Sequence, residues 1–182
     1  MTVPALLPTY PPFPPTMQSA AGEWIHAEDG SRWLDLYGDH CVASTGHCHP
    51  KVVEAIAAQA GQLIFYSTAG AMRVRNRAAE ALIDFAGGAG VASVFFCNSG
   101  AEANENALKI AKKLTGRSKI AGFTGGWHGR ALSCLAVTED PKITTPYADW
   151  LPPSLRLPFN DVAALDAVPW SELAAVILEP VQ

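Results

Sequence analysis

A short segment around residue 98 constrains this chain more than any other part of its sequence. The apolar run Val91–Cys97 has the composition of a strand that is buried on both faces of a parallel sheet. The small residues Ser99-Gly100-Ala101 follow it, and a helical pattern then runs from Ala101 to Leu114. The first N–H groups of a helix lack internal partners and lie at the positive end of the helix dipole. The segment therefore predicts an anion-binding turn at the carboxyl edge of a sheet.

The rest of the pattern predicts an α/β fold. A proline-rich start up to Pro15 indicates an extended arm, and Asp29-Gly30 indicates a β-hairpin between residues 23–26 and 31–36. Helices are expected over residues 50–63 and 72–85, and further strands over residues 119–123 and 173–178. The apolar positions expected to face inward on the three helices are Val52, Val53, Ile56, Ala60, Leu63, Val74, Ala78, Ala81, Leu82, Phe85, Ala107, Leu108, Ala111 and Leu114.

Strands and helices that alternate in this way form a mainly parallel sheet flanked by helices, with right-handed crossovers. Ligands bind beyond the carboxyl ends of the strands in such sheets. The two loops expected at that edge cover residues 98–101 and 124–130.

Composition excludes several classes of partner. The chain has 182 residues, 49% of them apolar, and a net charge of −4 with interspersed signs. It therefore lacks the basic patch of a nucleic-acid-binding protein, and no apolar run is long enough to span a bilayer. The first residues lack the basic start and apolar core of a signal peptide, so we expect a cytoplasmic protein. The scattered cysteines are expected to be reduced.

A local cluster of metal-ligand residue types, His40-Cys41 and His47-Cys48-His49, is compatible with a turn that merely contains them. Adjacent residues of an extended chain point to opposite faces, and no second pair follows at ligand spacing. We therefore predict no metal site.

Ser99 lies between a predicted strand and a predicted helix, which admits two functions. It could be the nucleophile of a serine hydrolase, but Cys97 and Ala101 replace the glycines of a nucleophile elbow. It could also cap the helix beside a phosphate. In the second loop, Trp127 offers a flat face for an aromatic ring and Arg130 offers a planar fork for a carboxylate. Together these groups suit a phosphorylated aromatic cofactor and an acidic substrate.

A set of motifs occurs in one order along nearly the whole chain: Pro8-Thr9-Tyr10, Asp29-Gly30, Trp33-Leu34-Asp35-Leu36, Gly46-His47-Cys48-His49-Pro50, Asn98 to Glu105, His128-Gly129-Arg130, and Ile177 to Gln182. In these motifs the chain resembles the class III, pyridoxal-phosphate-dependent aminotransferases of fold type I. The similarity is greatest to the acetylornithine and ornithine aminotransferase branch.

The resemblance implies a role for each site residue. Ser99, Gly100 and Ala101 would hold the phosphate of pyridoxal 5'-phosphate, Trp127 would stack on its ring, and Arg130 would bind the substrate carboxylate. Glu179 and His128 would lie close to the site. The chain departs from the usual pattern by placing tryptophan at the stacking position, where phenylalanine or tyrosine is common. Ala131 also replaces a threonine or serine.

The resemblance further implies a domain division and a homodimer. Residues 1–66 would form the arm, hairpin and helix of a small domain, and residues 67–182 the first part of the cofactor-binding large domain. The arm and residues 65–68 would reach the partner's site in such a dimer.

The family's Schiff-base lysine and its pyridine-binding aspartate lie beyond the Glu-Pro-Val-Gln motif, which here is the end of the chain at Gln182. No catalytic residue is therefore expected within the chain. We expect the N-terminal portion of an enzyme that transfers an amino group from an acetylornithine-like ω-amino donor to 2-oxoglutarate, inactive and poorly soluble by itself. The alternatives are the serine hydrolase and a non-catalytic dimerisation partner.

Overall fold

A computed structural model describes residues 15–87 and 90–182. The predicted arm motif Pro8-Thr9-Tyr10 lies outside these residues. The chain forms two compact units, which divide between Arg77 and Ala78. The assignment of small- and large-domain parts, with its boundary at residue 66, stays a prediction.

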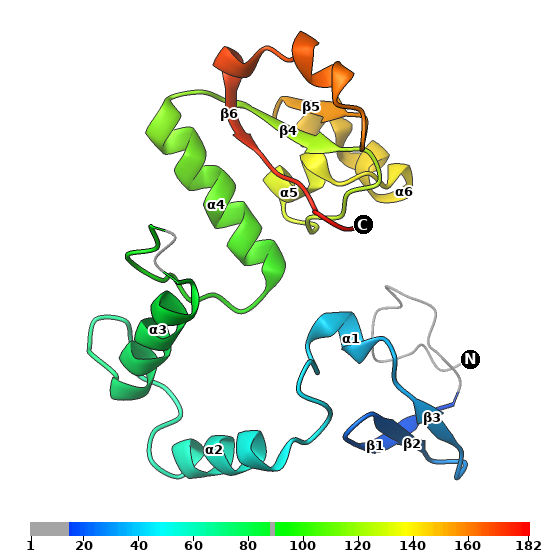
Figure 1. The fold of residues 1–182 in the computed structure, drawn as a ribbon, viewed down its shortest axis with the longest axis vertical. Coiled ribbons are helices and arrows are strands. Elements are labelled where there is room, and N and C mark those ends of the chain that lie inside the picture. Colours follow the sequence, from blue (N-terminus) through cyan, green and yellow to red (C-terminus); the bar gives the residue numbers. More distant parts are fainter. Residues whose placement is uncertain (1–14, 88–89) are drawn as a thin grey trace. The chain divides into compact units, whose positions relative to one another are not determined.

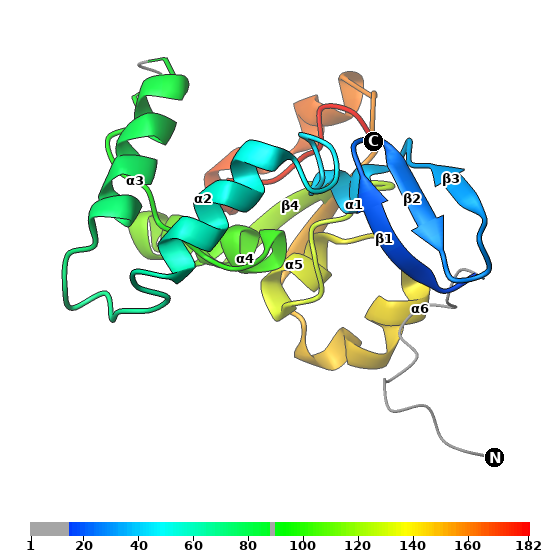
Figure 2. The ribbon, with the colours of Figure 1, turned by 90° about the horizontal axis from the view of Figure 1, so that it is seen from below.

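The first unit contains an antiparallel sheet of β1 (Met17–Ala21), β2 (Trp24–Ala27) and β3 (Arg32–Leu34). The predicted hairpin is present, with Asp29-Gly30 in its turn (Figure 2). β1 was not expected from the sequence. It pairs along β2 and thereby extends the hairpin by one strand. The label α1 (Gly38–Cys41) covers a turn whose residues have positive φ, so it is not a regular helix.

Two longer helices follow in the predicted places, but their apolar stripes are not buried. α2 (Pro50–Ala60) begins with proline at its first position, and α3 (Arg73–Phe85) ends before Gly87. Neither helix has a buried residue. The prediction of inward-facing stripes is therefore wrong for both, because no described segment covers those faces. The large side chains of the predicted stripes that are exposed are Val52, Val53, Ile56, Leu63, Val74, Leu82 and Phe85.

The second unit contains the parallel sheet. Its strands are β4 (Lys119–Phe123), β5 (Ser154–Leu157) and β6 (Leu173–Val176), in the order β5-β4-β6, and both pairings are parallel (Figure 1). The predicted α/β class with a parallel sheet flanked by helices is confirmed. Ile120 and Ala121 of the central strand are fully buried. β5 was not expected from the sequence.

Helices cover this sheet. α4 (Gly100–Thr115) is capped by Ser99 and ends at Gly116 as predicted, and it packs against β6 and α5 (Leu132–Val137). Leu108 is the buried member of its predicted stripe, whereas Leu114 is 80% exposed. α5 was missed from the sequence, although five of its six residues are buried. The shorter helical segments are α6 (Pro141–Thr144), η1 (Thr145–Trp150), η2 (Ala163–Ala167) and η3 (Trp170–Glu172).

The predicted strand over residues 91–97 is absent. Residues 91–97 have no strand assignment, and no backbone hydrogen bond joins them to another described segment. Phe95 is 70% exposed and Phe96 is 43% exposed. An apolar run becomes a strand only when another strand satisfies its backbone groups, and no described segment does so here.

Candidate functional site

The two loops predicted to form a site lie together in the second unit. The turn at residues 98–101 begins α4, and the loop at residues 124–130 follows the carboxyl end of β4. Gly129 joins them, because a Cβ placed on it would lie only 2.7 Å from the Cβ of Ala101. Its φ of +119° is a second reason for glycine at this position. The two loops are therefore in contact, but the predicted edge is not formed as expected, because the described residues 91–97 before the turn at residues 98–101 form no strand.

The turn at the start of α4 keeps donors available. Ser99 accepts a hydrogen bond from the N–H of Glu102 through its Oγ at 3.1 Å, and the Glu102 carboxylate accepts from the N–H of Asn98 at 2.6 Å. The N–H groups of Gly100 and Ala101 donate to no acceptor in the described chain. Nothing lies within 4 Å of where a Cβ of Gly100 would be. Two backbone donors and the hydroxyl hydrogen of Ser99 therefore have room for an anion.

Carboxylates and a hydroxyl fix the backbone of the loop that follows β4. The N–H of Trp127 donates to Glu179 Oε1 at 2.5 Å, and the N–H of Gly125 donates to Glu139 Oε2 at 2.5 Å. The N–H of His128 donates to the buried Oγ1 of Thr138 at 2.9 Å. The sequence placed Glu179 close to the site, and its contact with Trp127 shows how it reaches the loop.

The side chains of Trp127 and Arg130 are both exposed, Trp127 by 45%. Trp127 immediately precedes the buried His128, and Arg130 immediately follows Gly129. The packing of Gly129 on Ala101 thus brings the backbone of both residues next to the start of α4. The cofactor and substrate roles of these residues stay predictions.

Sequence reasoning missed two residues of α4 that hold this loop. Asn104 donates from Nδ2 to the carbonyl oxygen of His128 at 3.0 Å. Glu105 Oε2 accepts from the N–H groups of Ser133 at 2.9 Å and Cys134 at 3.2 Å. The available signal was spacing, because residues three and four positions after Ala101 share its helix face.

His128 is 5% exposed, and its Nε2 has no hydrogen-bond partner among the residues that the structure describes. Burial lowers the pKa of the imidazole from its ordinary value of 6.5, and the nearby Glu179 carboxylate partly opposes this effect. His128 is therefore held as a neutral ring behind the loop. The nucleophile of a serine hydrolase pairs with a histidine, and no hydrogen bond joins Ser99 to a histidine among the described residues.

The first unit contains a separate group of potential metal ligands, made of Asp35, Asp39 and His47. Their ligand atoms lie within 4.8 Å of one another. The Asp35 carboxylate already accepts hydrogen bonds from the N–H groups of Tyr37 and Gly38, each at 2.8 Å, and pairs with His47 Nε2 at 2.7 Å. These contacts account for Asp35 and His47 without an ion. The predicted absence of a metal site stays a prediction.

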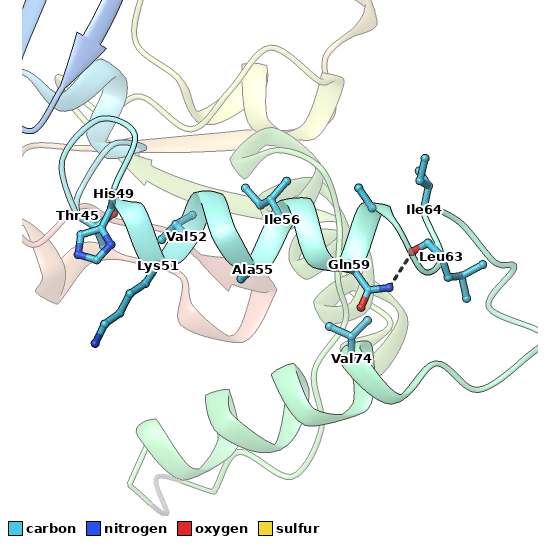
Figure 3. Close-up of a pocket in the computed structure, with 11 residues that line it drawn as sticks. Thr45, His49, Lys51, Val52, Ala55, Ile56, Gln59, Leu63, Ile64 and Val74 are labelled. Atoms are coloured by element: carbon cyan, nitrogen blue, oxygen red, sulfur yellow. Dashed lines mark hydrogen bonds between the residues drawn. The ribbon is translucent and has the colours of Figure 1, made fainter.

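An apolar pocket in the first unit contains none of the predicted site residues. Figure 3 shows it along α2, with Val52 and Ile56 on the helix, Leu63 after it, and Val74 at the start of α3. It is lined by part of the stripe that the sequence predicted to be buried. No helix among the described residues is long and apolar enough to cross a membrane.

The buried imidazole generates a prediction about pH. Because the folded state lowers the pKa of His128, the unfolded chain takes up a proton first as the pH falls below the ordinary value of 6.5. The contribution of His128 to the free energy of unfolding is therefore complete above that pH and is lost as the pH falls further. Chemical denaturation between about pH 7 and pH 5 should show a steeper loss of the free energy of unfolding for the wild type than for His128→Asn. If the free energies of unfolding of the two proteins fall in parallel with pH, the lowered pKa of His128 is contradicted.

Comparisons of the sequence and of the structure with known proteins point to the same family. Residues 8–182 match the family described as Aminotransferase class-III. The acetylornithine aminotransferase of Halalkalibacterium halodurans is 38% identical over 177 residues, which cover 97% of this chain and 45% of that protein. The acetylornithine aminotransferase of Methanopyrus kandleri is 38% identical over 174 residues, covering 96% of this chain and 44% of that protein.

A solved ornithine aminotransferase from Toxoplasma gondii, with pyridoxal phosphate partially occupying its active site, is similar in structure. Its TM-score is 0.88 at 25% sequence identity, and the match covers 98% of this chain and 43% of that chain. This chain thus spans less than half the length of these relatives. The family match over residues 8–182 shows that the chain belongs to the class III aminotransferases, which depend on pyridoxal phosphate.

Proposed function

We propose that this chain forms the part of an acetylornithine-type aminotransferase that binds the phosphate and the ring of pyridoxal phosphate. The enzyme would transfer an amino group from an acetylornithine-like ω-amino donor to 2-oxoglutarate. One observation carries the proposal: Gly129 packs on Ala101, so the anion-binding turn and the loop bearing Trp127 and Arg130 are neighbours. The names of the curated relatives support the choice of amino donor.

The residues at the start of α4 fit a phosphate group. The N–H groups of Gly100 and Ala101 and the hydroxyl hydrogen of Ser99 would donate to its oxygens. Gly100 leaves open space where another residue would place a side chain. The positive end of the helix dipole adds an attraction for the negative charge.

Trp127 and Arg130 complete the binding groups that the chain supplies. The exposed indole of Trp127 would stack on the pyridine ring, and its backbone is held for this by Glu179. Arg130 would bind the carboxylate of the substrate through its planar guanidinium. His128 and Glu179 would support the loop from behind rather than contact the substrate.

Pyridoxal phosphate supplies the electron sink that amino-group transfer needs. Within this chain, Ser99, Gly100 and Ala101 would anchor it, Trp127 would orient it, and Arg130 would orient the substrate. In a homodimer, which the family commonly forms, exposed apolar side chains of α2 and α3 would be available for contact with a second copy.

A series of variants at Ser99 tests phosphate binding. Pyridoxamine 5'-phosphate is the suitable probe, because it lacks the aldehyde that reacts with lysine side chains. Ser99→Ala should weaken its binding by about 10-fold or more, since a hydrogen bond to a charged group contributes roughly 1.5–3 kcal/mol. Ser99→Asp should retain the helix cap but repel the phosphate. Calorimetric titration measures both effects.

Ser99→Asp is also the control for folding, because aspartate caps helices about as well as serine does. Its free energy of unfolding should stay within about 0.5 kcal/mol of the wild type while binding is lost. Binding by Ser99→Asp with wild-type affinity would contradict the proposed phosphate site.

The proposal also makes a prediction about covalent chemistry. Transamination requires a lysine that holds the cofactor and moves a proton. The lysines on α4 are Lys109, Lys112 and Lys113, and Lys112 and Lys113 lie in its last turn, at the opposite end from Ser99. By the family pattern none of them serves this role, so the 182 residues alone should not transaminate. Borohydride reduction after addition of pyridoxal phosphate, followed by peptide mapping, should show no stoichiometric adduct at one lysine. A single fully modified lysine with turnover of an amino donor would overturn the prediction.

A further inference from the structure

We propose that Asn104 and Glu105 are positioning residues that fix Trp127 and Arg130 relative to the phosphate-binding turn. The inference rests on the proposed function and extends it to two side chains. Both lie within the motif Asn98 to Glu105, but the resemblance implied no role for either of them. Neither residue would touch the cofactor or the substrate. Both would act through the backbone of residues 128–134.

The geometry begins with one face of α4. Ala101, Asn104 and Glu105 lie at positions i, i+3 and i+4, so their side chains leave the helix on the same side. Each contacts the same stretch of chain. Ala101 meets Gly129, Asn104 donates to the carbonyl oxygen of His128, and Glu105 accepts from the N–H groups of residues 133 and 134.

The contacts lie on both sides of Arg130. Asn104 holds the carbonyl group of His128, the residue after Trp127, and Glu105 holds the chain three residues beyond Arg130. All three contacts come from the first two turns of α4. They therefore fix the position of the loop relative to Ser99, Gly100 and Ala101 at the start of the same helix. A shift of the loop would change the distance between the phosphate and ring contacts.

Glu105 also substitutes for a missing helix cap. The N-cap residue of α5, Ala131, has no side chain that could accept a hydrogen bond. Ser133 and Cys134 are buried, so their N–H groups would be unsatisfied without the Glu105 carboxylate. The nearby carboxylate adds to burial in raising the pKa of the Cys134 thiol to about 12. The two hydrogen bonds are partly buried, and a lost acceptor is costly there.

The first test measures the hold on the loop without any cofactor. Amide hydrogen exchange in the full 182-residue chain should be faster over residues 128–134 in Asn104→Ala and Glu105→Ala, by about 10-fold. Glu105→Gln retains an oxygen acceptor and should stay within about 3-fold of the wild type. Asn106→Ala is the matched control, because the Asn106 amide donates to Glu102 within α4. Glu80→Ala, on α3, controls for removing a glutamate.

The second test separates positioning from general stability. Binding of pyridoxamine 5'-phosphate should weaken by about 10-fold in Asn104→Ala, equivalent to about 1.4 kcal/mol. If Asn104 acts through Trp127, the loss should largely vanish in a Trp127→Ala background, giving a non-additive double-mutant cycle. A role in overall folding would instead give additive losses.

The outcomes distinguish the inference from the proposed function. Unchanged exchange over residues 128–134 would overturn the inference whether or not the chain binds the probe. Faster exchange with wild-type affinity, or additive losses in the cycle, would overturn the positioning role while leaving the phosphate site intact. Failure of the wild type to bind the probe would reject the proposed function, and the positioning role with it. Faster exchange with non-additive loss of affinity is the expected result.

Discussion

The close contact between Ala101 and Gly129 is the constraint on which the site depends. It requires glycine, because a Cβ at residue 129 would lie 2.7 Å from the Ala101 Cβ and the φ of +119° is unfavourable for other residues. The contact joins a helix start that offers backbone donors to a loop that offers an indole and a guanidinium. Asn104 donates a hydrogen bond to this segment, and Glu105 and Thr138 accept hydrogen bonds from its backbone, so all three hold it in that place. The donors for the anion and the side chains that hold the loop therefore both lie in the first turns of α4.

The same chain leaves much apolar surface uncovered. Side chains on α2, on α3 and in residues 91–97 have the apolar periodicity or continuity of core elements, yet they are exposed. The hydrophobic effect acts on such surfaces, so their exposure indicates that they are suited to contacts beyond the described residues. The relatives extend to more than twice the length that this chain spans, which is consistent with that interpretation.

The sequence predicted those helix ends and turns that are determined by a few neighbouring residues. The cap at Ser99, proline at the start of α2, Gly116 after α4 and the Asp29-Gly30 turn all act within a few residues of themselves. Burial was predicted less well, because it depends on which segments cover a face. Residues 91–97 show this most clearly, since their strand-like composition lacks a described pairing partner. In the candidate site, the motifs predicted binding roles for residues 99–101, Trp127 and Arg130, which stay predictions, whereas the contacts of Asn104 and Glu105 required knowledge of which loop α4 contacts.

Nuclear magnetic resonance titration of the isotopically labelled chain with pyridoxamine 5'-phosphate is the most direct test of this account. The largest shifts should occur at the amides of Gly100 and Ala101 and at the indole N–H of Trp127, with one common dissociation constant. A common constant would show that the phosphate turn and the loop bind one ligand as a unit. Shifts confined to other parts of the chain, or separate constants for the turn and for Trp127, would contradict it.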